Sequence, residues 1–205
     1  VNEFTPCVMH DGRVLYTRWE YVDKGAGDVQ SLWSMHPDGS YPAHVYKNNV
    51  PKPPTLIDAR QLPGVSHQFL CIGAPHMPLA VGPVMLVDIH KGQLNPGAMT
   101  NLTPEIALPL HYGYPGGAKG FYKEPYPLSE KLFLVAYSFG PQHDTPAGYG
   151  LYVLDTTGYR ELIYRDGLIS CWQPIPVRRR TVPPVIPGIA PAGGEPLRGA
   201  AHLIP

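Results

Sequence analysis

Turn-forming residues divide this chain into short segments. Its 205 residues include 26 prolines and 22 glycines, which leaves little room for long helices. The segments between the turns are rich in aromatic and β-branched residues, and 43% of the chain is hydrophobic, too much for a disordered polymer. These features predict an all-β fold.

A pattern of strand, loop, strand and turn occurs three times. The two strand-like segments of each copy are residues 11–19 and 31–36, 67–73 and 83–89, and 130–137 and 150–155. A turn glycine follows the second segment of each copy, at Gly39, Gly92 and Gly158, and residues 43–46 and 161–164 resume the extended pattern. Such a unit buries its faces only by stacking on neighbours.

This repeat predicts blades of a β-propeller. The turn glycines are spaced more widely than the roughly 40 to 50 residues of common blades, and Pro-rich and Gly-rich loops account for the extra length. Since propellers use about four to eight blades, about three blades form a partial propeller. We assign residues 1–176 to the blades and the Pro-rich residues 177–205 to a linker or tail.

Charge and hydropathy exclude two classes of partner. The 16 basic and 16 acidic residues give a formal net charge of zero, so the electrostatic signature of a nucleic-acid binder is missing. The apolar stretches are shorter than the roughly 18 residues of a membrane span, and residues 1–6 do not form an export signal. We therefore expect no nucleic-acid partner and no membrane span.

The cysteines limit the cofactors. Cys7, Cys71 and Cys171 are isolated, without a C-x-x-C or a C-x-x-C-H motif, so the sequence encodes no zinc ribbon and no covalent haem attachment. Because the number is odd, they cannot all pair within the chain. One disulfide with one free thiol stays open.

Several segments resemble one known family. Residues 11–21, 32–39, 59–64, 126–130 and 172–176 are similar to the middle, propeller domain of the hydrazine synthase α subunit and its relatives. The resemblance covers roughly residues 5 to 187, and its blade motifs are shared with TolB-like and WD40-like propellers. It implies a periplasmic or extracellular protein whose neighbouring domain carries c-type haem.

Three functions follow from this resemblance. The first is a binding and scaffold module of a larger exported protein, which binds protein partners or positions neighbouring haem or catalytic domains. The second is a fragment of a metal-dependent or haem-dependent oxidoreductase, with part of the active site on propeller loops. The third is an independent TolB-like interaction protein. Whether the chain is an enzyme stays open.

Four residues are candidate metal ligands, and zinc is the candidate ion. Cys7 and His10 form a C-x-x-H pair just before the first strand, a separation that lets both side chains reach one ion. His67 and His76 flank the strand of the second copy, where loop residues can crowd the mouth of a propeller channel. The alternatives are a buried thiol and histidines that bond to loop carbonyls.

Other residues carry weaker signals. His143 and Asp144 could form an acid–base pair or belong to a solvated turn, and the tryptophans could form a binding surface or pack the blades. The run of three arginines at 178–180 could contact an acidic partner or lie in a solvated linker. No nucleophile with a defined base is present.

Overall fold

The computed structural model describes residues 2–23, 25, 27–77, 80–115, 119–140 and 145–189. The described residues form twelve strands and two short 3₁₀ helices, η1 (Ile89–Lys91) and η2 (Pro96–Ala98), without an α-helix. The predicted all-β fold is confirmed. No described helix has the length and apolar character needed to cross a membrane.

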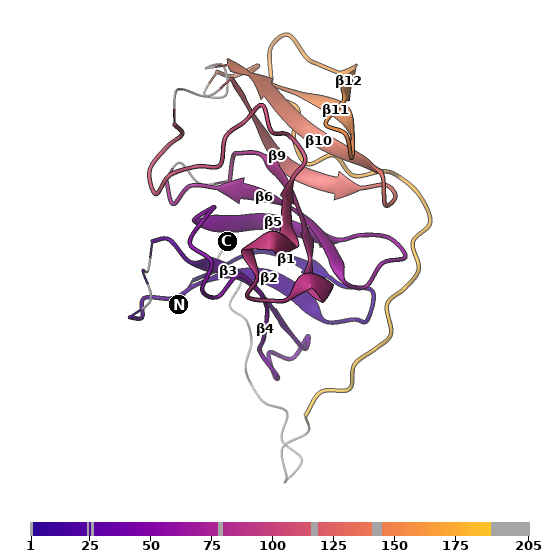
Figure 1. The fold of residues 1–205 in the computed structure, drawn as a ribbon. Helices are drawn as coiled ribbons and strands as arrows, with labels where there is room; N and C mark the ends of the chain where they lie inside the picture. The colour runs from indigo at the N-terminus through magenta and orange to yellow at the C-terminus, as the bar shows by residue number, and fades with distance from the viewer. Residues whose placement is uncertain are drawn as a thin grey trace.

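The strands form three antiparallel units of four strands each (Figure 1). Unit 1 consists of β1 (Asn2–Val8), β2 (Val14–Trp19), β3 (Gln30–Met35) and β4 (Ala43–Tyr46). Unit 2 consists of β5 (Thr55–Gln61), β6 (Gln68–Ala74), β7 (Val84–Asp88) and β8 (Met99–Asn101). Unit 3 consists of β9 (Gly120–Pro127), β10 (Leu132–Phe139), β11 (Tyr149–Asp155) and β12 (Arg160–Tyr164).

The units are distinct although two of them share a sheet. A single parallel residue pair, Gln30 with Thr55, joins units 1 and 2 into eight strands, whereas unit 3 is a separate four-stranded sheet. Within each unit, neighbouring strands pair antiparallel. The three copies in the sequence therefore correspond to three structural units, and no closed ring forms among the described residues.

Asp-capped turns explain why the repeat was visible in the sequence. In unit 1 the Asp38 carboxylate accepts hydrogen bonds from the backbone and hydroxyl of Ser40, and Gly39 has a φ of 82°. In unit 3 Asp155 does the same for Thr157, and Gly158 has a φ of 85°. A side chain that satisfies backbone donors and a glycine with positive φ define a tight turn.

The first strand of each unit was missed by the sequence pattern. β1 contacts β5, and β5 contacts β9, so the three first strands lie side by side. Each is irregular in its pairing, and each contains a residue with positive φ near the irregularity: Thr5 (44°), Asp58 (55°) and Glu124 (50°). β-bulges break the alternation on which strand prediction depends.

These positive-φ residues are linked from one unit to the next. The backbone N–H of Asp58 donates to Thr5 Oγ1 at 3.1 Å, and the backbone N–H of Glu124 donates to the Asp58 carboxylate. The backbone N–H of Gln173, which also has positive φ (50°), donates to Glu124 Oε2 at 2.6 Å. We call these four residues the left-handed series. Its last member lies beyond unit 3.

Two clusters of buried side chains hold the units together. One spans units 2 and 3 and includes Ile57, Leu70, Leu102, Phe133 and Val135. The other spans units 1 and 2 and includes Leu15, Leu32, Tyr46, Leu56 and Phe69. Unit 2 therefore packs on both neighbours.

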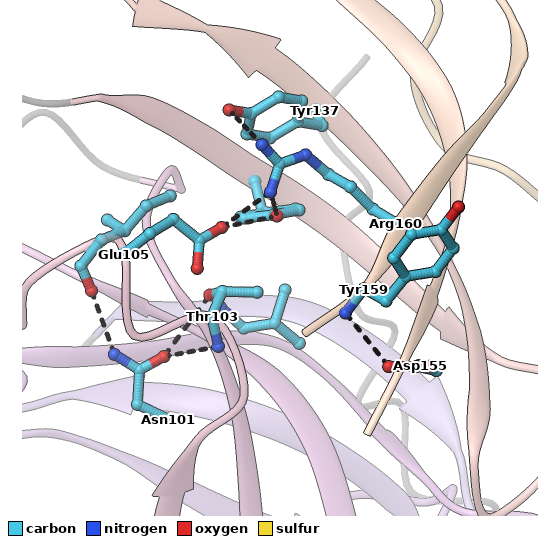
Figure 2. A network of polar contacts seen from close by, with 10 residues as sticks. Asn101, Thr103, Glu105, Tyr137, Asp155, Tyr159 and Arg160 are labelled. Atoms are coloured by element: carbon cyan, nitrogen blue, oxygen red, sulfur yellow. Dashed lines mark hydrogen bonds and ion pairs between the residues drawn. The ribbon is translucent and has the colours of Figure 1, made fainter. Parts of the chain in front are cut away.

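A polar network crosses the contact between units 2 and 3 (Figure 2). The guanidinium of Arg160 donates to Glu105 Oε1 and to the Tyr122 hydroxyl, both at 2.8 Å, and to the Tyr137 hydroxyl at 3.1 Å. Because Glu105 follows β8 and the other three residues belong to unit 3, this network fixes the two units relative to each other.

The segment after β12 runs from unit 3 back to unit 1, as the yellow chain in Figure 1 shows. It has no regular secondary structure in residues 165–189. Arg178 donates to the Leu128 carbonyl of unit 3, and the backbone N–H of Ile189 donates to Asp38 of unit 1. The assignment of residues 177–205 to a linker or tail stays a prediction.

Candidate functional site

A histidine–aspartate cluster lies at one end of unit 2. His67, Asp88 and His90 place one potential metal-ligand atom each within 4.8 Å of one another. The two imidazoles are stacked, with ring centroids 3.7 Å apart and planes 7° from parallel. His67 Nε2 lies 3.9 Å from Asp88 Oδ1.

The fold of unit 2 assembles this cluster from two chain segments. β6 and β7 pair antiparallel with Gln68 opposite Asp88, which brings His67 to the end of β7. Asp88 then caps η1, because its Oδ1 accepts from the backbone N–H of His90 at 3.1 Å. The backbone N–H of Ile89 donates to the His67 carbonyl at 3.0 Å, so both histidines are held at fixed positions.

The donor set suits a divalent transition metal. Two imidazole nitrogens and a carboxylate oxygen are ligands of zinc, and a site with three protein ligands leaves a position for water. His67 and Asp88 are partly buried, whereas His90 is exposed, so an ion could enter from solvent. Small side-chain rotations would bring the donors to the roughly 2 Å bond lengths of zinc.

Of the predicted ligands, only His67 belongs to a cluster of this kind. Among the described residues, no group of three potential ligands includes Cys7, His10 or His76. Asp88 and His90 were not among the predicted ligands. Asp88-x-His90 directly follows a strand that pairs with the one after His67, so the predicted hairpin contained the signal.

Cys7 and His10 lie instead in the wall of a cavity at the ends of the first strands. Cys7 Sγ donates to the Ala59 carbonyl at 3.0 Å, and burial raises the pKa of the thiol to about 11. A thiol in this state is neutral and is a poor metal ligand. The exposed His10 is fixed by its backbone N–H, which donates to Gln61 Oε1.

His76 lies in an aromatic cluster. Its ring centroid is 5.0 Å from Trp19 and 5.2 Å from His111, and Gln30 Nε2 bonds to its Nδ1 at 2.9 Å. His111 in turn bonds to Asp28 at 2.6 Å. This cluster uses Trp19 for side-chain packing.

The other residues with possible roles are the cysteines, the three arginines and the pair His143 and Asp144. All three cysteines are free thiols, so no disulfide forms between them in this structure. Arg178, Arg179 and Arg180 line the same cavity as Cys7 and His10. The pair His143 and Asp144 lies outside the described residues.

The similarity of this chain to known proteins lies in its structure. No family model matches the sequence, and no curated protein matches it. The structure is similar to a solved structure of Kuenenia stuttgartiensis hydrazine synthase over 90% of this chain, with a TM-score of 0.67 and 22% sequence identity. The matched part is 22% of that chain. The likeness shows that this chain and part of hydrazine synthase share a fold.

Proposed function

We propose that this chain is a set of β-propeller blades that serves as a binding and scaffold module of a larger exported protein. In that protein it positions neighbouring haem or catalytic domains. The observation that carries this proposal is the left-handed series, which continues into Gln173 after unit 3. Gln173 occupies the place that Thr5, Asp58 and Glu124 occupy in the first strands of units 1 to 3.

The sequence around the series supports a fourth unit. Each member is followed by proline or alanine, at Pro6, Ala59, Pro125 and Pro174. A residue with positive φ is uncommon outside glycine, so its recurrence at four linked positions marks a structural repeat. We propose that the segment at 171–177, which is not a strand in this structure, becomes the first strand of a further blade when it pairs with additional chain.

The exposed end of unit 3 supports the same conclusion. Leu132 and Tyr164 are exposed on the face of unit 3 turned away from unit 2, and the segment after β12 exposes Leu168 and Ile169. Exposed apolar side chains that cluster in this way mark an interaction surface. The next blade of the same polypeptide would cover them.

Hydrogen exchange tests this proposal. The chain is produced alone and together with the remainder of its parent polypeptide, and amide exchange is followed in β12. We expect β12 to exchange rapidly in the chain alone and to become protected in the assembly. Leu132→Lys, an exposed leucine on the face of β10 turned away from unit 2, should abolish that protection. Leu162→Lys should leave it unchanged, because Leu162 pairs with Tyr152, which packs against the cluster between units 2 and 3. Exchange that is identical in both samples would contradict the proposal.

The cluster at His67 favours a second candidate, a fragment of a metal-dependent oxidoreductase. Its test is zinc content after dialysis, by elemental analysis, for the parent chain and for Asp88→Asn, His90→Ala and the control His36→Ala. This candidate expects one zinc per chain, lost in the first two variants and kept in the control. A metal-free parent chain would eliminate it.

A further inference from the structure

A cavity lies where the first strands end. It has a volume of about 910 Å³, which is within the range of small-molecule sites. Residues from three first strands and from the C-terminal segment form its walls: 6–10 from β1 and the turn after it, 60, 61, 63 and 64 from the end of β5 and the turn after it, 126–127 from β9, and 178–183. The cavity is therefore a feature of the whole assembly of units.

The charges around this cavity have one sign. Arg60, Arg178, Arg179 and Arg180 line it together with His10, and no aspartate or glutamate lines it. Over the part of the chain that the structure describes, none of these arginines forms an ion pair with a carboxylate. Four guanidinium charges in one concavity repel one another unless an anion joins them.

The contacts of these arginines orient them without neutralising them. Arg60 and Arg180 both lie over the ring of Tyr126, at 5.1 and 5.7 Å from its centroid. Arg178 donates to the Leu128 carbonyl at 3.3 Å. An aromatic face and a carbonyl leave the positive charge in place, so the guanidinium groups keep donors for a ligand.

Two acidic residues on the strands that form the cavity wall already accept hydrogen bonds from the backbone. Asp58 and Glu124 precede Arg60 and Tyr126 by two positions on the same strands, and both accept hydrogen bonds from backbone amides within the left-handed series. Neither lines the cavity.

We propose that this cavity binds a small organic anion that carries at least two phosphate or carboxylate groups. Arginine presents a planar fork of donors that matches such groups, and charge-assisted bonds of this type are strong. The volume admits more than a single phosphate, and a separate chain segment adds Arg178, Arg179 and Arg180 to Arg60, so two anionic groups can be bound at once. This inference is independent of the proposed scaffold function.

Calorimetric titration tests the inference on the full chain. Pyrophosphate and citrate are titrated in 50 mM NaCl, with glucose as the uncharged control. We expect binding of at least one anion and none of glucose. Pyrophosphate binding alone would assign a phosphate ligand, and citrate binding alone a carboxylate ligand.

Variants locate the site. Arg60→Gln and Arg179→Gln should each weaken binding about tenfold or more, since a charge-assisted bond contributes about 1.5–3 kcal/mol. Lys131→Gln, which removes an exposed charge in the turn between β9 and β10, should change it less than twofold. Arg179 is exposed, so its variant stays informative even if Arg60→Gln destabilises the fold; circular dichroism checks both. Absence of binding to either anion, or equal affinity in Arg179→Gln and Lys131→Gln, would overturn the proposal.

Discussion

The two sides of unit 3 differ. The side toward unit 2 buries Phe133 and Val135 against residues such as Ile57 and Leu102, and Arg160 closes its rim with a charged network. On the other side Leu132 of β10 is 46% exposed. Unit 3 is therefore packed against a neighbour on one side and exposed to solvent on the other.

This difference shows how a repeat protein distributes its stability. Each unit depends on its neighbours to bury its apolar surface, and the interface terms contribute as much as the unit itself. Unit 2 has both neighbours, whereas unit 3 has one. We therefore expect substitutions on the covered side to be costly and equivalent ones on the open side to be almost neutral.

Removing a covered aromatic side chain should have the largest effect. Phe133 is fully buried in the cluster between units 2 and 3, so Phe133→Ala should lower the free energy of unfolding by about 3–5 kcal/mol. Leu132→Ala, on the open side, should change it by less than about 0.5 kcal/mol. Urea denaturation followed by tryptophan fluorescence measures both. Equal losses would mean that the two sides do not differ in energy.

Replacing Asp58 should raise the stability of the fold in a pH-dependent way. Burial, and next the charge of Glu124, raise the pKa of its carboxyl from 3.8 to about 6. The folded state thus binds this proton more tightly than the unfolded state, and the stabilisation that protonation provides is complete below about pH 4 and lost as the pH rises through 6. Asp58→Asn should therefore stabilise the fold above pH 6, by up to about 3 kcal/mol.

Asparagine suits the position in two further ways. It tolerates positive φ, and its side-chain oxygen can still accept the Glu124 N–H. Thermal melts between pH 4 and 8 measure the difference in Tm from the parent chain. A difference that does not change with pH would show that the Asp58 charge is not its cause.

Alanine substitutions at the equivalent turn glycines of units 1 and 3 should differ in their cost. A Cβ on Gly158 would lie 2.7 Å from the Leu102 carbonyl oxygen of unit 2, whereas a Cβ on Gly39 would meet nothing within 4 Å. Both have positive φ, so both alanine variants bear the same backbone strain. Gly158→Ala should cost about 1–3 kcal/mol more than Gly39→Ala. Equal changes in the urea midpoint would show that the turn of unit 3 accommodates the added Cβ without loss of stability.

The smallest effect is expected from the charged network. Arg160 and Glu105 are partly exposed, so Arg160→Met should cost about 1 kcal/mol, and less in 0.5 M NaCl because salt screens the pair. A double-mutant cycle with Glu105→Gln isolates the pair. A coupling energy of zero would mean that the apolar cluster alone stabilises the contact between units 2 and 3.

The parts of the fold predicted from sequence are those with local signals. Asp38-Gly39 and Thr157-Gly158 define turns through their own side chains and φ angles, and the strands beside them alternate regularly. The sequence pattern did not predict β1, β5 and β9, because a bulge interrupts each of them at Thr5, Asp58 or Glu124. Their stability comes from neighbouring units.

The candidate sites, too, were predictable only where the signal in the sequence is local. His67 was a candidate from its place beside a predicted strand, and its partners Asp88 and His90 became evident only when the register of β6 against β7 was known. The arginines at 178–180 were visible as a charge run. That they share a cavity with Arg60 depends on a contact between segments more than a hundred residues apart.

The sequence alone determined the all-β class, the number of repeated units and the absence of a haem attachment motif, because turns, alternation and short motifs act over a few residues. Only the tertiary structure decided which strands line the cavity, which charges meet there and that Gln173 continues the series. These features arise from packing between units, and no local pattern in the chain encodes which distant segments will meet.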